Sequence, residues 1–146
     1  MLLLKRNRSP NQGLWSPPGG KLDLGSGESP FASAAREAQE ELCIPVRHSD
    51  LHLMGIVSEQ GAEGHWLMFL FRLLPPLVEI PPSHPEGAFN FFTRAEMEKI
   101  PLPETDKESI WPLFWRNRKG FFVAHCEITE TGREWSIDQE IHSGKA

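Results

Sequence analysis

Between residues 30 and 42, apolar and charged positions repeat with the period of an α-helix. The apolar positions that share one side are Phe31, Ala35, Ala38 and Leu42. Ser29 and Pro30 form a strong helix start, because serine caps the first turn and proline fits the first helical position. Pro45 stops the pattern soon afterwards. These features predict one amphipathic helix over residues 30–42.

Short apolar runs bounded by turn residues predict strands. The runs lie at residues 2–6, 51–58, 65–74, 89–92 and 121–128, with a further brief strand at 21–24. Gly61 and Gly64 separate the runs at 51–58 and 65–74, so we expect those two strands to form an antiparallel hairpin.

Two more helices are predicted from a capping pattern. Thr93 and Glu96 stand three residues apart, so each side chain can bond to the backbone N–H of the other residue. Thr105 and Glu108 repeat this spacing at the start of a second helix. Pro112 should kink that second helix or split it in two, because proline has no backbone N–H.

Composition places this chain of 146 residues among ordinary globular proteins, with 39% hydrophobic and 24% charged residues. We expect one domain over residues 1–128 and a polar, poorly ordered tail over 129–146. No apolar run reaches about 18 residues, so no membrane span is expected. The net charge of −5 argues against binding to duplex nucleic acid. At the N-terminus the charged residues follow the apolar ones, whereas in a secretory signal they precede them. The two cysteines are isolated, which is typical of a reducing compartment, so we expect a cytoplasmic protein.

The charged side of the helix predicted at 30–42 carries three glutamates. Glu37, Glu40 and Glu41 stand three and four residues apart, so their side chains can converge. The loop Pro17–Lys21 just upstream contains two glycines, which let a main-chain carbonyl approach a bound cation. Such oxygen donors favour Mg²⁺ or Mn²⁺. The alternative is a solvated acidic face with an Arg36–Glu40 ion pair of about 0.3–0.5 kcal/mol.

The spacing of the residues around these glutamates forms a longer motif. Glu28 is followed by seven residues and then by Arg36-Glu37-Ala38-Gln39-Glu40-Glu41-Leu42-Cys43-Ile44. This order resembles the Nudix box of the Nudix hydrolases, and the segments Gly13–Trp15 and Pro18–Lys21 resemble the sequence that leads into it. The box covers residues 20–44 and is specific because it fixes many positions at once. The chain therefore resembles a MutT-like Nudix hydrolase.

The resemblance implies an α/β fold of the Nudix type, which is an α/β/α sandwich with a mixed central sheet. It also implies hydrolysis of a nucleoside diphosphate linked to another group, with Mg²⁺ or Mn²⁺. Carried over position by position, the metal ligands would be the carbonyl of Gly19 and the carboxylates of Glu37, Glu40 and Glu41. Glu37 is alternatively the general base that acts on water. Arg36 and Glu28 would pair with each other and orient the ligands.

The chain departs from the Nudix pattern in three places. Seven residues rather than five separate Gly20 from Glu28, and we expect Gly25–Gly27 to absorb the two extra residues. Cys43 stands where the box has glycine, in a place that favours a left-handed backbone, so we expect mild strain there. In the family, another strand normally precedes the strand at 2–6. Without that preceding strand, the sheet would have an exposed edge that a partner chain could cover, so a homodimer remains an open alternative.

Four charged residues outside the helix predicted at 30–42 are further candidates. Nudix hydrolases often take a further acidic ligand or base from a loop after the second hairpin strand, so the resemblance makes Glu86 a candidate metal ligand or base, with Glu79 behind it. Arg6 and Lys21 flank the glycine loop and are candidate substrate contacts through phosphate. For each of these residues, simple surface charge is an equally good interpretation.

Two other groups of residues favour structural roles. A zinc site would draw on Cys43, His48 and His52, but their spacing fits no common zinc pattern. A base-stacking platform would draw on Trp111, Phe114 and Trp115, but their helical spacing is more typical of a core.

The resemblance leaves the substrate open. ADP-ribose hydrolases of the family often have a proline about fifteen residues past the box, and diadenosine-polyphosphate hydrolases a tyrosine slightly further on. Residues 58–63 contain neither, and the chain has no tyrosine. We therefore expect MutT-like hydrolysis of a nucleoside triphosphate, including oxidised purine nucleotides. An ADP-ribose or other nucleotide-sugar pyrophosphatase, a non-catalytic nucleotide-binding module and an acidic interaction domain remain alternatives.

Overall fold

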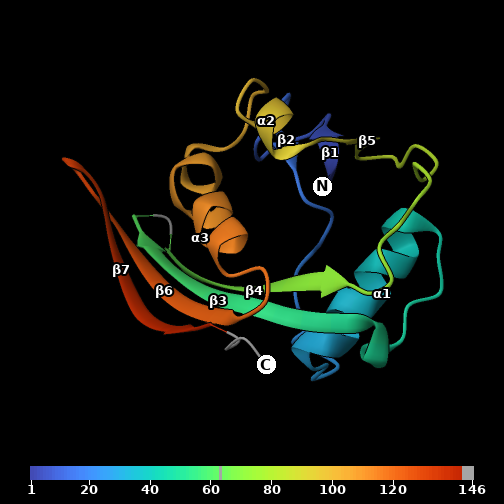
Figure 1. The fold of residues 1–146 in the computed structure, drawn as a ribbon, viewed down its shortest axis with the longest axis horizontal. Coiled ribbons are helices and arrows are strands. Elements are labelled where there is room, and N and C mark those ends of the chain that lie inside the picture. Colours follow the sequence, from blue (N-terminus) through green and yellow to red (C-terminus); the bar gives the residue numbers. More distant parts are fainter. Residues whose placement is uncertain (63, 143–146) are drawn as a thin grey trace. The chain divides into compact units, whose positions relative to one another are not determined.

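The computed structural model describes residues 1–62 and 64–142 and contains two compact units, each with its own sheet (Figure 1). The first unit comprises Met1–Leu51 and Leu73–Lys107, and the second comprises His52–Arg72 and Glu108–Ala146. Helices lie between groups of strands along the chain, and one of the two sheets is mixed, so the predicted α/β class is confirmed. The strands form two sheets rather than the single central sheet that we expected.

The sheet of the first unit is antiparallel and has the order β2-β1-β5. Its strands are β1 (Leu2–Arg6), β2 (Trp15–Ser16) and β5 (Gly87–Phe91). Because β1 pairs with β2 on one side and β5 on the other, the expected bare edge at the first strand is wrong. Leu4, Leu42 and Phe89 form the buried core of this unit, which ties the sheet to helix α1.

Helix α1 (Pro30–Leu42) has the predicted bounds and the predicted start. The Ser29 hydroxyl accepts a hydrogen bond from the Ala32 N–H at 3.2 Å, and Pro30 occupies the first turn. Leu42 is only 4% exposed, and Ala38 packs on the same core, as the apolar stripe requires. The opposite side of α1 is therefore free to present its charged residues.

Cys43 ends α1 in a left-handed conformation, with φ 57° and ψ 33°. Its N–H donates to the Gln39 carbonyl at 3.1 Å, which closes the last turn. A side chain at this backbone conformation crowds the carbonyl that follows it, whereas glycine has no such contact. The expectation of strain at this position therefore has a structural basis.

We predict that Cys43→Gly stabilises the metal-free protein by about 1 kcal/mol, because it removes the Cβ from a left-handed residue. Urea denaturation measures the difference in the free energy of unfolding. Cys43→Ala is the matched control, because it removes the thiol but keeps the Cβ, and it should change stability little. A destabilised Cys43→Gly protein would contradict the prediction.

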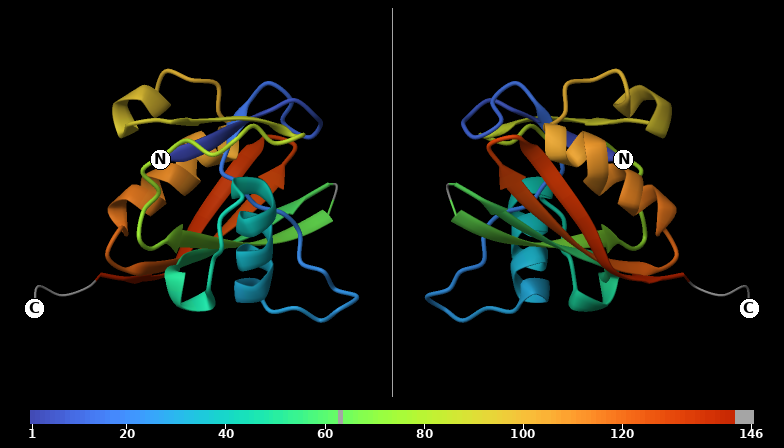
Figure 2. Two further views of the ribbon diagram at one scale, coloured as in Figure 1. Left: turned by 90° about the vertical axis from the view of Figure 1, so that its right-hand side faces the viewer. Right: turned by 90° about the vertical axis from the view of Figure 1, so that its left-hand side faces the viewer.

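The sheet of the second unit is mixed, as predicted, and has the order β4-β3-β6-β7. Its strands are β3 (Leu51–Gly61), which begins in the first unit, β4 (Gly64–Leu73), β6 (Phe121–Thr129) and β7 (Gly132–Ile141). β3 runs parallel to β6, and β6 runs antiparallel to β7 along most of its length (Figure 2). The core of this unit consists of Val57, Ile110, Leu113, Phe122 and Ala124.

Strand β7 overturns the expectation of a poorly ordered tail from residue 129. It pairs with β6 from Thr129↔Gly132 to Phe121↔Ile141. Its sequence is polar because it is an edge strand, whose free side faces water and tolerates charge. Trp135 nevertheless packs against the core. Residues 143–146 of the expected tail lie outside the described residues.

The two capping patterns had different outcomes. Thr93 and Glu96 make both bonds of a capping box at the start of α2 (Arg94–Met97), so that prediction is confirmed. Thr105 lies inside a helical stretch rather than at its start, so the second capping prediction is wrong. That stretch continues as a π-helix, η2 (Asp106–Ile110), directly before α3.

Helix α3 (Trp111–Arg116) has Pro112 in its first turn, where a missing N–H costs little. The wide π turn just before it changes the hydrogen-bond register around the proline. Trp111 and Phe114 are each 8% exposed and pack edge to face at 5.7 Å between ring centroids, which confirms their core role. Within the described part of the chain, no helix has the length and apolar character needed to cross a bilayer.

Candidate active site

The glycine loop of the first unit lies directly on the glutamates of α1. The Gly19 N–H donates to Glu41 Oε2 at 3.0 Å, and Gly19 has φ 153°, a conformation that favours glycine. A Cβ on Gly20 would overlap the carboxyl group of Glu37. The two glycines are therefore required because their backbone approaches two of the three carboxylates closely.

Glu41 is the most buried of these glutamates, with 5% of its surface exposed. Burial, followed by the negative charges of Glu37 and Glu86, raises the pKa of Glu41 to about 7, while the Gly19 N–H and the charge of Arg6 oppose the shift. One atom each from Glu41, His84 and Glu86 could bind a metal, and these atoms all lie within 4.8 Å of one another. A bound cation would relieve this concentration of negative charge.

The raised pKa of Glu41 makes metal binding depend on pH. A cation needs the ionised carboxylate, and Glu41 is protonated below about pH 7 in the metal-free protein. We predict that the affinity for Mn²⁺ falls about tenfold for each pH unit below 7 and levels off above it. Isothermal titration calorimetry between pH 6 and 8 measures this dependence. An affinity that is constant over this range would contradict the prediction.

The same shift has a defined effect on stability. The pKa of Glu41 in the folded protein lies above its ordinary value of 4.5. The contribution of protonated Glu41 to the free energy of unfolding is therefore complete below pH 4.5 and is lost as pH rises through about 7. The metal-free protein should therefore lose this contribution over the range in which it gains affinity for the cation.

Arg36 holds the other carboxylates around it. Its Nε and Nη2 donate to the two oxygens of Glu28 at 3.1 and 2.7 Å, and its Nη1 donates to Glu37 Oε1 at 2.7 Å. Glu40 Oε2 lies 3.5 Å from Nη1 and is more exposed. The hydrogen bonds from Arg36, followed by the Asp23 N–H, lower the pKa of Glu28 to about 2. The structure thus has the contact between Arg36 and Glu28 that the motif implied.

The two additional residues before Glu28 form a local turn. Asp23 Oδ1 accepts from the N–H groups of Gly25 and Ser26 at 3.0 and 3.3 Å. The Asp23 N–H in turn donates to Glu28 Oε1 at 2.7 Å. This turn replaces the strand that we expected at 21–24, because the Asp23 side chain takes the N–H groups that follow it. The insertion is absorbed before α1, and the spacing within the helix is unchanged.

The turn His84–Gly87 brings two further side chains to Glu41. His84 and Gly87 exchange backbone hydrogen bonds at 2.9 Å in both directions. Asn7, directly after β1, donates from its N–H to the Glu86 carbonyl at 2.8 Å and from Nδ2 to the Pro85 carbonyl at 2.9 Å. This turn is consequently held at both ends and in the middle.

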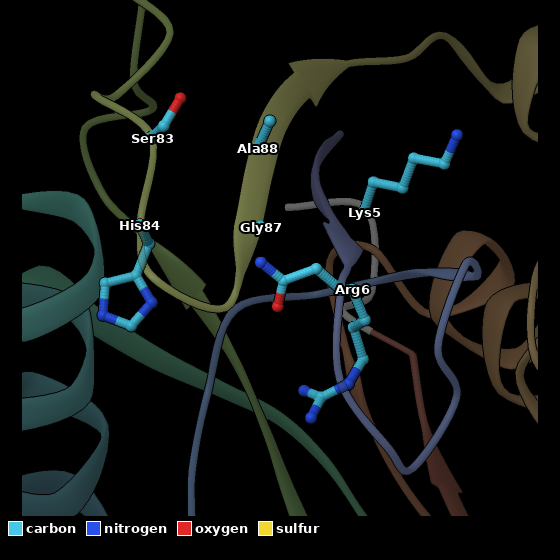
Figure 3. Close-up of a pocket in the computed structure, with 7 residues that line it drawn as sticks. Lys5, Arg6, Ser83, His84, Gly87 and Ala88 are labelled. Carbon is cyan, nitrogen blue, oxygen red and sulfur yellow. The ribbon is translucent and has the colours of Figure 1, made fainter.

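A pocket of about 430 Å³ opens beside this turn (Figure 3). The residues that line it are Lys5, Arg6, Asn7, Ser83, His84, Gly87 and Ala88. Its polar side chains carry hydrogen-bond donors, and none of its lining residues is acidic. Figure 3 shows the His84 ring and the Arg6 guanidinium on either side of Gly87, while the Lys5 amine extends away from both. Arg6 Nη1 also lies 3.6 Å from Glu86 Oε2.

The structure brings some of the expected site residues together and leaves others apart. Glu86 joins Glu41, whereas Glu79 is exposed and outside this group. Glu37 and Glu40 lie beside Arg36 rather than in the group with Glu41. His84 was missed, although it stands only two residues before Glu86 in the sequence. Among the described residues, the metal-binding group contains none of Cys43, His48 and His52, whose spacing fitted no common zinc pattern.

Comparison with known proteins decides the family. The family model for the NUDIX domain matches residues 1–113. The chain belongs to the Nudix family. A structural neighbour, the MutT protein of Bacillus halodurans, is 27% identical with a TM-score of 0.70, and the match covers 94% of this chain and 88% of that protein. This protein is therefore a Nudix hydrolase that acts on pyrophosphate bonds.

A second solved structure supports the Nudix fold alone. It is the NUDIX domain of Shewanella oneidensis NrtR in complex with ADP ribose, with 21% identity and a TM-score of 0.62. The match covers 80% of this chain and 75% of that one. A search of curated proteins found no match.

The site fits the divalent metal that Nudix enzymes generally use. Burial, followed by the negative charges of Glu37 and Glu86, raises the pKa of Glu41, and an oxygen of Glu86 lies within 4.8 Å of an oxygen of Glu41. Two carboxylates whose oxygens lie this close form a donor set suited to a hard divalent cation.

Proposed function

We propose that this Nudix hydrolase uses Mg²⁺ or Mn²⁺ to cleave the diphosphate linkage of a nucleoside triphosphate. The observation that carries the proposal is the burial of Glu41 next to Glu86, which raises the pKa of Glu41 to about 7. Such a carboxylate is costly to keep ionised without a cation beside it. The further proposed ligands are the carboxylates of Glu37 and Glu40 and the carbonyl of Gly19.

The side chains of the site have separate roles in the reaction. The metal, when bound, offsets charge on the bridging phosphates and lowers the pKa of a bound water. Glu37 takes a proton from the attacking water or serves as a further metal ligand. Arg36 Nη1 donates a hydrogen bond to Glu37 Oε1 at 2.7 Å and so holds the Glu37 carboxylate in place. Arg6 and Lys21 bind phosphate oxygens of the substrate.

The MutT-like substrate is favoured by the neighbour with 27% identity, which is a MutT protein. A nucleoside triphosphate, including an oxidised purine nucleotide, is therefore the first candidate. ADP ribose is the second candidate, because the NrtR domain binds it in its solved structure. Both contain the pyrophosphate bond that the family hydrolyses.

A substrate panel tests the proposal. The protein is incubated with nucleoside triphosphates, oxidised purine triphosphates, ADP ribose and diadenosine polyphosphates, each with Mg²⁺, with Mn²⁺ and with EDTA. We expect multiple turnovers and pyrophosphate release with a triphosphate, and none with EDTA. Turnover of ADP ribose alone would replace the first candidate by the second. Stoichiometric binding without turnover across the panel would overturn the proposal.

A further inference from the structure

We infer that His84 binds a phosphate oxygen of the substrate through its Nε2–H group and is not a ligand of the metal. This inference rests on the proposed function, because it concerns the same site. It assigns different chemistry to a residue whose position alone would suggest a third metal ligand.

The hydrogen bond to the His84 ring selects its tautomer. The Glu86 N–H donates to His84 Nδ1 at 3.3 Å. An imidazole nitrogen that accepts a hydrogen bond carries no proton, so the proton of the neutral ring lies on Nε2. In this tautomer, Nδ1 accepts a hydrogen bond and Nε2 carries a proton, so neither nitrogen has a free lone pair for a cation.

Binding a metal through Nε2 would require the opposite tautomer. Nδ1 would then carry a proton that points at the Glu86 N–H, and two donors would face each other. Asn7 holds Glu86 and Pro85 in place, and His84 exchanges two backbone bonds with Gly87. Because the turn is fixed in this way, it cannot easily rotate the Glu86 N–H out of the way.

The surroundings of the His84 ring indicate which acceptor its Nε2–H group would contact. His84 lines the pocket whose other polar side chains come from Lys5, Arg6, Asn7 and Ser83, all of which carry donors. A ring nitrogen of His84 also lies within 4.8 Å of an oxygen of Glu41 and of Glu86. No hydrogen bond joins His84 to either carboxylate in the described structure, so the Nε2–H remains available. An anion next to a cation on those carboxylates would be its acceptor, and a phosphate group of the substrate supplies one.

Two variants of His84 separate the roles. His84→Ala removes the ring, whereas the amide of His84→Gln places an N–H near the position of Nε2. We expect His84→Ala to bind Mn²⁺ within about twofold of the unmodified protein and to raise KM for the substrate about tenfold or more, as for a lost hydrogen bond to a charged group. His84→Gln should restore most of the affinity for the substrate. A tenfold or greater loss of Mn²⁺ affinity in His84→Ala would overturn the inference.

Two measurements do not depend on turnover. ¹⁵N NMR of the His84 ring should show the Nε2–H tautomer before and after addition of Mg²⁺, and a change to Nδ1–H on Mg²⁺ binding would overturn the inference. Calorimetry with a methylene-bridged, non-hydrolysable nucleotide and Mg²⁺ should show weaker binding to His84→Ala, and equal binding would overturn it. His52→Ala, an exposed histidine on β3, is the control and should change neither result. If the unmodified protein turns over no substrate, the proposed function fails, while these two measurements still decide the role of His84.

Discussion

Glu41→Gln is expected to lower kcat/KM by roughly 10²–10³-fold, the loss typical of removing one preorganised charge-stabilising group. The variant keeps an oxygen that can accept the hydrogen bond from Gly19, so the loop should remain in place. It removes only the negative charge on which the cation depends. Steady-state kinetics with Mg²⁺ and calorimetry with Mn²⁺ should show the loss of activity together with a loss of metal affinity.

The same substitution should raise the melting temperature of the metal-free protein at pH 8. Burial raises the pKa of Glu41, so its ionised form opposes folding at that pH, and a neutral amide does not. Glu79→Gln is the matched control, because Glu79 is an exposed glutamate of the same unit. A Glu41→Gln protein with full activity would contradict the assignment, and one with a lower melting temperature would contradict the electrostatic argument.

Gly20→Ala is expected to lower kcat by about 100-fold, because small displacements of a catalytic group have effects of this size. The added Cβ would overlap the carboxyl group of Glu37, which must then leave its place beside Arg36. Neither Glu41 nor Glu86 is among the nearest contacts of the new methyl group. Mn²⁺ binding should therefore persist if Glu37 acts as the base, and should weaken if Glu37 is itself a metal ligand. Steady-state kinetics and Mn²⁺ calorimetry together test this separation of the two effects.

Gly25→Ala is the control for a methyl group added to the same loop. Its Cβ would meet only Asp23 Oδ1, at 3.3 Å, well away from the carboxylates of α1. It should retain most of the activity. If Gly20→Ala kept the kcat of the unmodified protein, Glu37 would have no catalytic role at its present position.

Local sequence predicted the parts of the site that depend on spacing along the chain. Ser29 and Pro30 start α1 where the local pattern predicted, because a helix start depends on neighbours within one turn. The contact between Arg36 and Glu28 was implied by the resemblance to the Nudix box and not by the pattern of side chains alone.

The features that sequence reasoning missed depend on pairing between distant segments. His84 reaches Glu41 only because β5 pairs with β1 and Asn7 holds the turn before β5. Likewise, β7 is ordered by its partner β6 and not by its own polar sequence. The period of a segment does not reveal which strand lies beside it.

The pairing of β1 with β5 also sets an order of events during synthesis. Leu2 lies opposite Phe91, so β1 cannot complete this sheet until Phe91 has been made. Contacts between such distant residues form late, because a long loop must close first. The nascent chain can therefore form α1 with Glu41 well before Glu86 and His84 arrive. In a refolding experiment, helix signal should recover before the capacity to bind Mn²⁺.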